Sequence, residues 1–451
     1  MARIVKVLKF IGGGLLILVA AIGMWLWLYP PALLRIGSGY TAKIVCSNVF
    51  IAKRDAEEVL TVDVQAPGNP LLRLMSVSVD YQQHRVRAAL LGIFAGNEAV
   101  YRNGLGCTVA PVAGHLVPAV RGVDSLPVAD ASLSWPQGQQ VESDQAVMAI
   151  LSDEAAIGPG MRAVVVVKAG RIVAEAYGPA FSKDTPLLGW SMTKTVNAAI
   201  IGTLIRNNKL SLADNDLLPE WHGDGRRDIR LTDLLAMESG LAFNENYGTV
   251  ADVTRMLYLE PDMAYFTAAK KEEAAPGSRF NYSSGTPILL ARIWMDRLGD
   301  AQHALDYPHK ALFIPLGMRS AVMEVDAAGT FVAGSYMYAT ARDWARFGLL
   351  LARDGMWNGE RLLPEGFVRA MHEPNSHSAG RYSRMQTWLP QRGEAGMPAD
   401  TFFMRGHDGQ TIAIMPSLDL VVVRLGLTPS SGGYNPTSLI AAVAKATDAD
   451  K

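Results

Sequence analysis

The chain has 451 residues, of which 49% are hydrophobic and 19% are charged, so it can bury a large core and is not a disordered protein. A formal net charge of -1 gives no reason to expect a nucleic-acid partner. Function must therefore be sought in local motifs rather than in composition.

The first predicted element is an apolar segment from Ile11 to Tyr29, close to the ~20 residues that span a membrane. Arg3, Lys6 and Lys9 precede it without an acidic residue, which favours an N-terminus on the cytoplasmic side. A cleaved signal peptide is the alternative, but its core is shorter and ends at small residues, whereas this segment ends in aromatic residues. We expect residues 1–30 to form a cytoplasmic tail and a single-pass anchor in the inner membrane, with the remainder of the chain on the periplasmic side.

A small accessory module is expected over residues 31–135. Arg54–Leu60 favours the start of a helix, and Leu72–Val79 and Val86–Leu91 alternate like paired strands. The stretch Pro118–Gln140 is rich in Pro, Gly, Ser and Asp, which is typical of a boundary. Nothing in this module points to a chemical reaction.

The chain contains two cysteines, Cys46 and Cys107, and both lie in the accessory module. In an oxidising compartment they are expected to form one disulfide. Two buried free thiols are the alternative. A lipid-modified Cys46 is disfavoured, because Lys43–Val45 does not resemble the end of a lipoprotein signal.

A second, larger domain is expected over residues 140–451. Arg162–Lys168 and Arg171–Tyr177 predict a hairpin around a two-residue turn, and Gln410–Met415 and Leu420–Leu425 predict two further strands. Helical patterns occupy the following ranges: Thr195–Asn207, Leu231–Met237, Pro287–Leu298, Thr340–Arg353 and Pro436–Thr447. Strands at both ends with helices between them predict an α+β fold whose sheet pairs N-terminal with C-terminal strands.

The strongest local signal is Ser191 followed three residues later by Lys194, at the start of an apolar helix. This spacing places both side chains on one helix face, where the lysine could take the proton of the serine hydroxyl. Burial would lower the affinity of the lysine for its own proton. Taken alone, the pair also suits a helix cap followed by a solvated lysine.

Two later motifs help to interpret the pair formed by Ser191 and Lys194. Tyr282-Ser-Ser284 lies on a turn-rich loop before a predicted helix, and His407-Asp-Gly409 lies at the entry to a predicted strand. The order Ser-x-x-Lys, Tyr-x-Ser, His-x-Gly resembles the signature of the serine β-lactamase and penicillin-binding-protein superfamily. A tyrosine in the second motif and a histidine in the third are most similar to the class C branch, which includes 6-aminohexanoate-dimer hydrolases and esterases.

The resemblance implies a β-lactamase/transpeptidase-like fold with an additional all-helical subdomain. It makes Ser191 the acylated nucleophile, Lys194 its proton partner and Tyr282 the acid/base for the leaving group and water. Ser284 would bridge toward Lys194. The oxyanion hole would consist of the main-chain N–H groups of Ser191 and Gln410. Which of the lysine and the tyrosine takes the first proton is left open, because the two would titrate together.

His407 and Gly409 complete the expected site. His407 would line it as a binding group, although it could instead hydrogen-bond neighbouring loops. Gly409 is expected because a side chain there would block substrate from the strand edge. Pocket-wall loops, Asn244–Met263 and Asn375–Gly396 among them, would determine the substrate.

The expected activity is hydrolysis of a small ester or amide through an acyl-enzyme, with no metal or organic cofactor and with the oligomeric state left open. One alternative is a penicillin-binding-like sensor without turnover. Another is a β-lactamase or D,D-peptidase, which the histidine of the third motif disfavours. Other polar residues fit structural roles: His372 and His377 have no metal-ligand spacing, and Asp214 and Asp216 suit turns.

Overall fold

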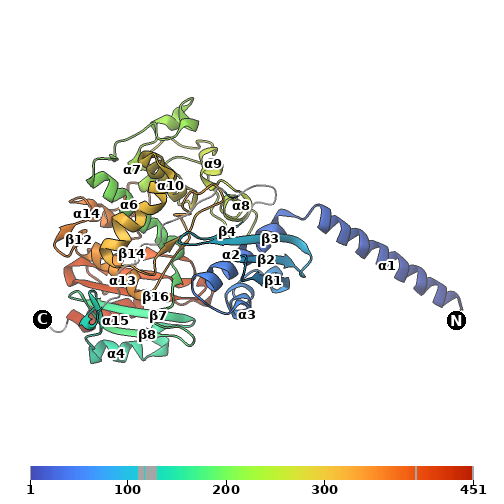
Figure 1. The fold of residues 1–451 in the computed structure, drawn as a ribbon, viewed down its shortest axis with the longest axis horizontal. Helices are drawn as coiled ribbons and strands as arrows, with labels where there is room; N and C mark the ends of the chain where they lie inside the picture. Colours follow the sequence, from blue (N-terminus) through green and yellow to red (C-terminus); the bar gives the residue numbers. More distant parts are fainter. Residues whose placement is uncertain (1, 110–115, 117–129, 392–393, 449–451) are drawn as a thin grey trace.

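The computed structural model describes residues 2–109, 116, 130–391 and 394–448 (Figure 1). A protruding helix leads into a small module of one long helix and a four-stranded sheet, and this module packs against a large α+β domain. Most of the expected boundary Pro118–Gln140 lies outside the described residues, which resume at Asp130.

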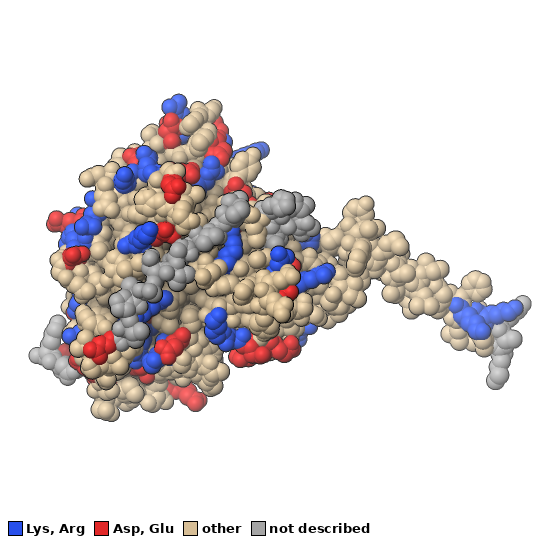
Figure 2. Space-filling view, in the orientation of Figure 1, with Lys and Arg blue, Asp and Glu red and all other residues tan. Residues whose placement is uncertain are grey.

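The N-terminal helix α1 (Ala2–Leu28) begins earlier than the predicted apolar segment. In the described part of the chain, Ile4–Leu28 is the one helix long and apolar enough to cross a membrane, a property that a signal sequence shares. Its apolar side chains are exposed rather than packed on the protein. Figure 2 shows it as a projecting rod whose basic side chains gather at the far end. The helix therefore has the composition of a membrane-spanning segment, and most of its surface is not covered by the rest of the protein.

The small module is built around α2 (Ala32–Phe50), a helix that the sequence analysis did not predict. Its segment mixes Gly, Ser and Thr with apolar residues, and most of its side chains from Ile36 onward are buried, so it lacks an amphipathic period. Four antiparallel strands follow in the order β1-β2-β3-β4: β1 (Met75–Asp80), β2 (Arg85–Leu90), β3 (Phe94–Arg102) and β4 (Gly106–Val109). The two predicted strands correspond to β1 and β2, and the predicted helix start to the short α3 (Ala56–Glu58).

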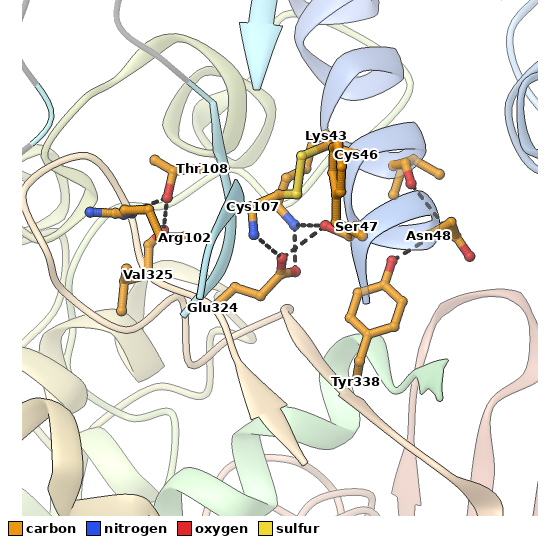
Figure 3. The surroundings of a disulfide bond; sticks show 12 residues. Lys43, Cys46, Ser47, Asn48, Arg102, Cys107, Thr108, Glu324, Val325 and Tyr338 are labelled. Atoms are coloured by element: carbon orange, nitrogen blue, oxygen red, sulfur yellow. Dashed lines mark hydrogen bonds and ion pairs between the residues drawn. A yellow bond between two sulfur atoms is a disulfide. The ribbon is translucent and has the colours of Figure 1, made fainter. Parts of the chain in front are cut away.

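The predicted disulfide between Cys46 and Cys107 is present and joins α2 to β4. Beside it, Glu324 of the large domain is fully buried and accepts hydrogen bonds from Lys43, from Ser47 Oγ at 2.8 Å and from the main-chain N–H of Cys107 at 2.6 Å (Figure 3). A buried carboxylate is stable only when it is paired and hydrogen-bonded in this way. The disulfide thus joins two elements of the module, and Glu324 fixes the module on the large domain.

Replacing both cysteines by serine is expected to lower the stability of the chain by roughly 2–5 kcal/mol, the usual effect of losing a native disulfide. The bridge closes a long loop, with a sequence separation of 61, and its loss would free that loop in the unfolded chain. Thermal unfolding of the full-length protein in detergent measures the change. Reduced wild-type protein should show the same lower melting temperature, and equal values for oxidised wild type and variant would contradict the prediction.

The large domain contains an antiparallel sheet in the order β14-β15-β16-β7-β8. N-terminal and C-terminal strands meet where β16 pairs with β7, for example Val423 opposite Val165, as predicted. The strands are β7 (Met161–Lys168), β8 (Arg171–Tyr177), β14 (Phe402–Arg405), β15 (Thr411–Met415) and β16 (Leu420–Gly426). Alternate side chains enter two apolar layers: Val165 and Val423 face the main core, and Val164 and Val422 face the layer under α4 and α15.

Helices cover the two faces of this sheet and build a helical region at one end of it (Figure 1). Their bounds are α4 (Gln145–Leu151), α5 (Glu154–Ile157), α6 (Thr193–Arg206), α7 (Leu231–Leu235), α8 (Asp252–Leu259), α9 (Met263–Ala268), α10 (Gly285–Leu298), α11 (Ala301–Pro308), α12 (Ile314–Leu316), α13 (Ala341–Ala352), α14 (Phe367–His372) and α15 (Thr437–Asp448). Short strands are β5 (Asp130–Ser134), β6 (Gly138–Gln140), β9 (Leu187–Leu188), β10 (Val322–Met323), β11 (Met337–Ala339), β12 (Met356–Trp357) and β13 (Glu360–Arg361). The predicted α+β fold is confirmed, with the five predicted helices present within a few residues.

Candidate active site

Ser191 lies in a single 3₁₀ turn, Trp190–Met192, directly before α6. The turn is tightly held: Thr193 Oγ1 donates to the Trp190 carbonyl at 2.7 Å. A Cβ atom on Gly189 would lie 2.4 Å from the ring of Trp344, so only glycine lets the chain pass this buried tryptophan. These contacts present Ser191 at the N-terminal end of α6, where main-chain N–H groups create a positive potential.

Lys194 is buried in the first turn of α6, with 1% of its surface exposed. Its Nζ lies 3.1 Å from Ser191 Oγ, 3.0 Å from Ser284 Oγ and 2.7 Å from the Gly334 carbonyl. Burial lowers the pKa of Lys194 to about 8, while the charge of Glu245 opposes this shift. A large fraction of the amine is therefore neutral near pH 8.

The neighbours of Lys194 also determine how a neutral amine would be oriented. The Gly334 carbonyl can only accept a hydrogen bond, and Ser284 Oγ donates its own proton to the Glu245 carboxylate, so both receive a proton from Nζ. A neutral amine has two protons and one lone pair. The lone pair is then directed at the third neighbour, the Ser191 hydroxyl.

Tyr282 lies on the loop before α10, beside both residues of the first motif. Its ring centre is 4.9 Å from Lys194 Nζ, and its ring packs against Tyr382 and Trp388 at 5.7 and 5.1 Å. Burial raises the pKa of Tyr282, the nearby charge of Glu245 raises it further, and a hydrogen bond with Ser191 opposes the shift. The phenol is therefore protonated at neutral pH and can donate at the reacting oxygen.

Ser284 is fully buried and connects Lys194 to two residues that the sequence analysis did not single out. Glu245 accepts from the main-chain N–H of Ser284 at 2.8 Å and from its hydroxyl. The Tyr247 hydroxyl lies 3.2 Å from Ser284 Oγ. Both belong to the predicted pocket-wall segment Asn244–Met263, which was the only signal for them in the sequence.

His407 lies at the rim of the site, with 60% of its side chain exposed. Its ring stacks on Tyr247 at 5.9 Å between centres and meets the ring of Trp190 edge-on at 5.7 Å. Because Trp190 directly precedes Ser191, the structure brings the third motif to the nucleophile. His407 therefore borders the site, while the buried Lys194 and Ser284 and the half-buried Ser191 and Tyr282 form its centre.

Two expectations for the third motif need correction. Gly409 does not border the substrate side: its φ is +80°, and a Cβ atom there would lie 2.9 Å from Arg424 Nη1. The main chain of Gln410 faces the neighbouring strand, since its carbonyl accepts from Gly406 N–H at 2.9 Å. The Gln410 side chain bonds loop carbonyls, including that of His407 at 3.0 Å. Both residues thus stabilise the hairpin turn between β14 and β15.

The structure instead brings β14 to the nucleophile, next to the Trp190–Met192 turn. A Cβ atom on Gly406 would lie 2.3 Å from the Gly189 carbonyl, so glycine is required for this approach. Phe403 N–H donates to Trp388, on the side away from β15. Because N–H directions alternate along a strand, Arg405 N–H points to this same outer edge.

The remaining polar candidates make contacts with neighbouring residues. His377 Nδ1 lies 3.0 Å from Glu238, and His372 stacks on Phe402. Asp214 accepts from Ser211 N–H in a turn. In the described part of the chain, no group of three or more His, Cys, Asp or Glu residues is arranged to hold a metal ion.

Comparison with known proteins places this site in a family. The Beta-lactamase family matches residues 154–438. The 6-aminohexanoate-dimer hydrolase of Paenarthrobacter ureafaciens is 24% identical over 293 residues, which are 59% of this chain and 72% of that protein.

Solved structures share the fold. A putative β-lactamase from Bacteroides dorei DSM 17855 superposes with a TM-score of 0.55 at 21% identity, covering 67% of this chain and 98% of its own. A putative 6-aminohexanoate-dimer hydrolase from Bacillus anthracis gives 0.52 at 23% identity, covering 64% and 79%. With a family match over more than half of its length and a Ser-Lys-Tyr cluster around a buried lysine, the chain belongs to the beta-lactamase family of serine hydrolases.

Proposed function

We propose that the protein is a membrane-anchored hydrolase that cleaves an ester or amide through an acyl-enzyme on Ser191. The observation that carries the proposal is the environment of Lys194: a buried amine with a lowered pKa, 3.1 Å from the nucleophile, with its other neighbours accepting its protons. A serine needs such a base before it becomes nucleophilic.

In the first step, Ser191 Oγ attacks the substrate carbonyl carbon as its proton passes to Lys194 Nζ. The carbonyl π-bond electrons move to oxygen and give a tetrahedral oxyanion. The N–H of Ser191 and the N–H of Arg405 are the proposed oxyanion donors, since both lie where α6 begins and β14 ends. Arg405 replaces Gln410 in this role because of the N–H directions along β14.

In the second step, the intermediate collapses and the bond to the leaving group breaks. Tyr282 donates its phenolic proton to the departing oxygen or nitrogen, and the proton on Lys194 restores the phenol. Water then attacks the acyl-enzyme while the same groups take its proton and return one to Ser191 Oγ. Acid, product alcohol or amine, and free enzyme result, so protons balance over the cycle.

Simple esters and amides are the proposed substrates rather than β-lactams. The relative from Paenarthrobacter ureafaciens is a 6-aminohexanoate-dimer hydrolase. The rim residue His407 occupies the place where we expect β-lactamases to have a lysine that holds the substrate carboxylate. A penicillin-binding-like sensor is less consistent with the contacts, because binding without turnover would not require Lys194 and Tyr282 around Ser191.

The proposed location is the inner membrane, with the catalytic domain on its periplasmic side. Support comes from the apolar helix Ile4–Leu28 with exposed side chains and from the basic residues at its N-terminal end. The Cys46–Cys107 disulfide suits an oxidising compartment such as the periplasm.

A substrate panel on the full-length protein in detergent tests the reaction class. We expect turnover of 4-methylumbelliferyl butyrate or of a linear or D-amino-acid amide, and little turnover of the β-lactam nitrocefin. Rapid nitrocefin turnover would indicate a β-lactamase instead. Acylation by a β-lactam without turnover of any ester or amide would indicate a sensor.

Replacing Glu245 by Gln is expected to move the pH-rate profile to lower pH. The negative charge of Glu245 raises the pKa of Lys194, so its removal lets the amine lose its proton at a lower pH. Gln keeps an acceptor for Ser284. Rates of ester hydrolysis from pH 6 to 10 give the midpoint for wild type and variant; an unchanged or higher midpoint would contradict the assigned electrostatics.

A further inference from the structure

A large apolar pocket lies between the small module and the active site. Its cavity volume is about 370 Å³, within the roughly 300–1,000 Å³ of ordinary small-molecule sites. Its lining includes Trp190, Tyr247 and His407 on one side, and apolar residues of α2 and of the turn before β1, such as Leu34 and Leu72, on the other. The ester or amide that reaches Ser191 would hence have room for a long apolar group.

Two residues that line this pocket also adjoin the reaction centre. Tyr247 lines the pocket and also lies 3.2 Å from Ser284 Oγ, which in turn is 3.0 Å from Lys194 Nζ. Trp190 lines the pocket and precedes the nucleophile in the chain. An acyl chain that enters past these rings would present its carbonyl group to Ser191.

The α2 side of the pocket lies next to the apolar span. Leu33 lines the pocket and is the second residue of α2, and only Tyr29–Pro31 separates α2 from α1. Three residues extend at most about 11 Å. The pocket mouth is thus held close to the point where α1 would leave a bilayer.

The hairpin between β2 and β3 adds an independent indication of a bilayer at this place. Phe94 at its tip contacts α1, since a Cβ atom on Gly23 would lie 3.8 Å from the Phe94 ring. Gly23 is roughly 7 Å inside the end of the apolar helix, at 1.5 Å per residue. Leu91 and Ile93 of the same tip are 57% and 54% exposed. A tip with these side chains would insert among lipid headgroups beside α1.

The walls of the pocket are fixed to one another rather than loosely joined. Its α2 wall is fixed to the large domain by the contacts of Lys43 and Ser47 with Glu324, and the disulfide joins α2 to β4 (Figure 3). Thr108 Oγ1 of β4 also donates to the Val325 carbonyl at 2.7 Å. These cross-links hold the mouth, the apolar wall and the catalytic centre in one arrangement.

We propose that the substrate is a membrane amphiphile, an ester or amide of a long acyl chain that enters the pocket from the bilayer holding α1. This inference rests on the proposed hydrolase function and specifies its substrate class. Burial of each additional methylene group favours binding about fourfold. Long-chain substrates should accordingly be preferred over short ones.

The test uses the full-length protein in phosphatidylcholine vesicles that contain 4-methylumbelliferyl palmitate or butyrate. Rates are divided by the amount of Ser191 that a fluorophosphonate probe labels, so that misfolded protein is not counted. We expect the palmitate ester to react at least tenfold faster. Ser191-dependent butyrate hydrolysis without any preference for palmitate would overturn the inference and leave the hydrolase function intact, whereas no hydrolysis of either ester would count against both.

Two further experiments change the side chains that line the pocket and the vesicles in which the substrate is placed. Leu33→Glu, or Leu71→Glu in the module turn that also lines the pocket, should reduce the palmitate-to-butyrate ratio at least tenfold. Leu74→Glu is the matched control, because Leu74 is exposed at 47% in the same module and does not line the pocket. An unchanged ratio in both pocket variants would overturn the inference. Palmitate placed in separate vesicles should react more slowly; equal rates would exclude delivery from the shared bilayer.

Discussion

Ser191→Ala is expected to lower ester hydrolysis by roughly 10⁴- to 10⁶-fold, as in other serine hydrolases that lose their nucleophile. The methyl group cannot form the acyl-enzyme, while the pocket and the buried amine remain in place. Fluorophosphonate labelling of the full-length protein in detergent gives a second measurement. Wild type should gain one covalent label at Ser191, and the variant should gain none.

Ser143→Ala is the matched control, because Ser143 is an exposed serine of the same domain, outside the site. It should be labelled and should hydrolyse esters like wild type. Labelling of Ser191→Ala at the wild-type level would contradict the assignment of the nucleophile. Loss of labelling with retained turnover would also contradict it, since the reaction would then proceed without the acyl-enzyme.

The sequence predicted those contacts in the site that join residues close together along the chain. Ser191 and Lys194 are three residues apart, and the first turn of α6 brings them together. Tyr282 could be assigned only through the order of the motifs. Its distance from Lys194 depends on how the loop before α10 packs on α6, which no single segment encodes.

Contacts between segments that are far apart in the sequence could not be predicted from it. Glu245, Tyr247 and the Gly334 carbonyl reach the site from loops without periodicity. The main determinant of the Lys194 pKa is burial, which arises only when α6, α10 and the loop that contains Gly334 pack together. Sequence patterns predict such residues as pocket walls at best.

The error at Gln410 has a specific structural cause. The sequence suggested a strand that begins at Gln410, with His407–Gly409 at its entry. The structure has an additional strand, β14, before the motif, so His407–Gly409 forms a hairpin turn. Because N–H directions alternate, this change moves the outward-facing donor from Gln410 to Arg405.

In the fold, too, elements with a strong local sequence pattern were predicted, and features that depend on contacts between distant residues were not. Strands β7, β8, β15 and β16 carry strong β-propensity, and they were predicted within a residue or two. Helix α2 was missed, because burial on all sides removes the period by which a surface helix is recognised. The residue that fixes this helix to the large domain, Glu324, is far from it in the sequence.

Lys194→Met is expected to lower the rate of acylation by roughly 10²- to 10⁴-fold, the usual contribution of a general base. Methionine fills a similar volume but cannot take the Ser191 proton. Wild-type activity should rise with pH as Lys194 loses its proton, with a midpoint at its pKa of about 8 and a plateau above it. Single-turnover kinetics with 4-methylumbelliferyl butyrate from pH 6 to 10 measure both effects.

The midpoint of the pH dependence distinguishes the two candidate bases. A neutral Lys194 gives a rise centred near pH 8, whereas a Tyr282 phenolate would need a much higher pH, because burial raises the pKa of Tyr282. In Lys194→Met the rise near pH 8 should disappear, and in the exposed control Lys209→Met it should remain. A midpoint near 8 that persists in Lys194→Met would assign the titration to another group and exclude Lys194 as the first base.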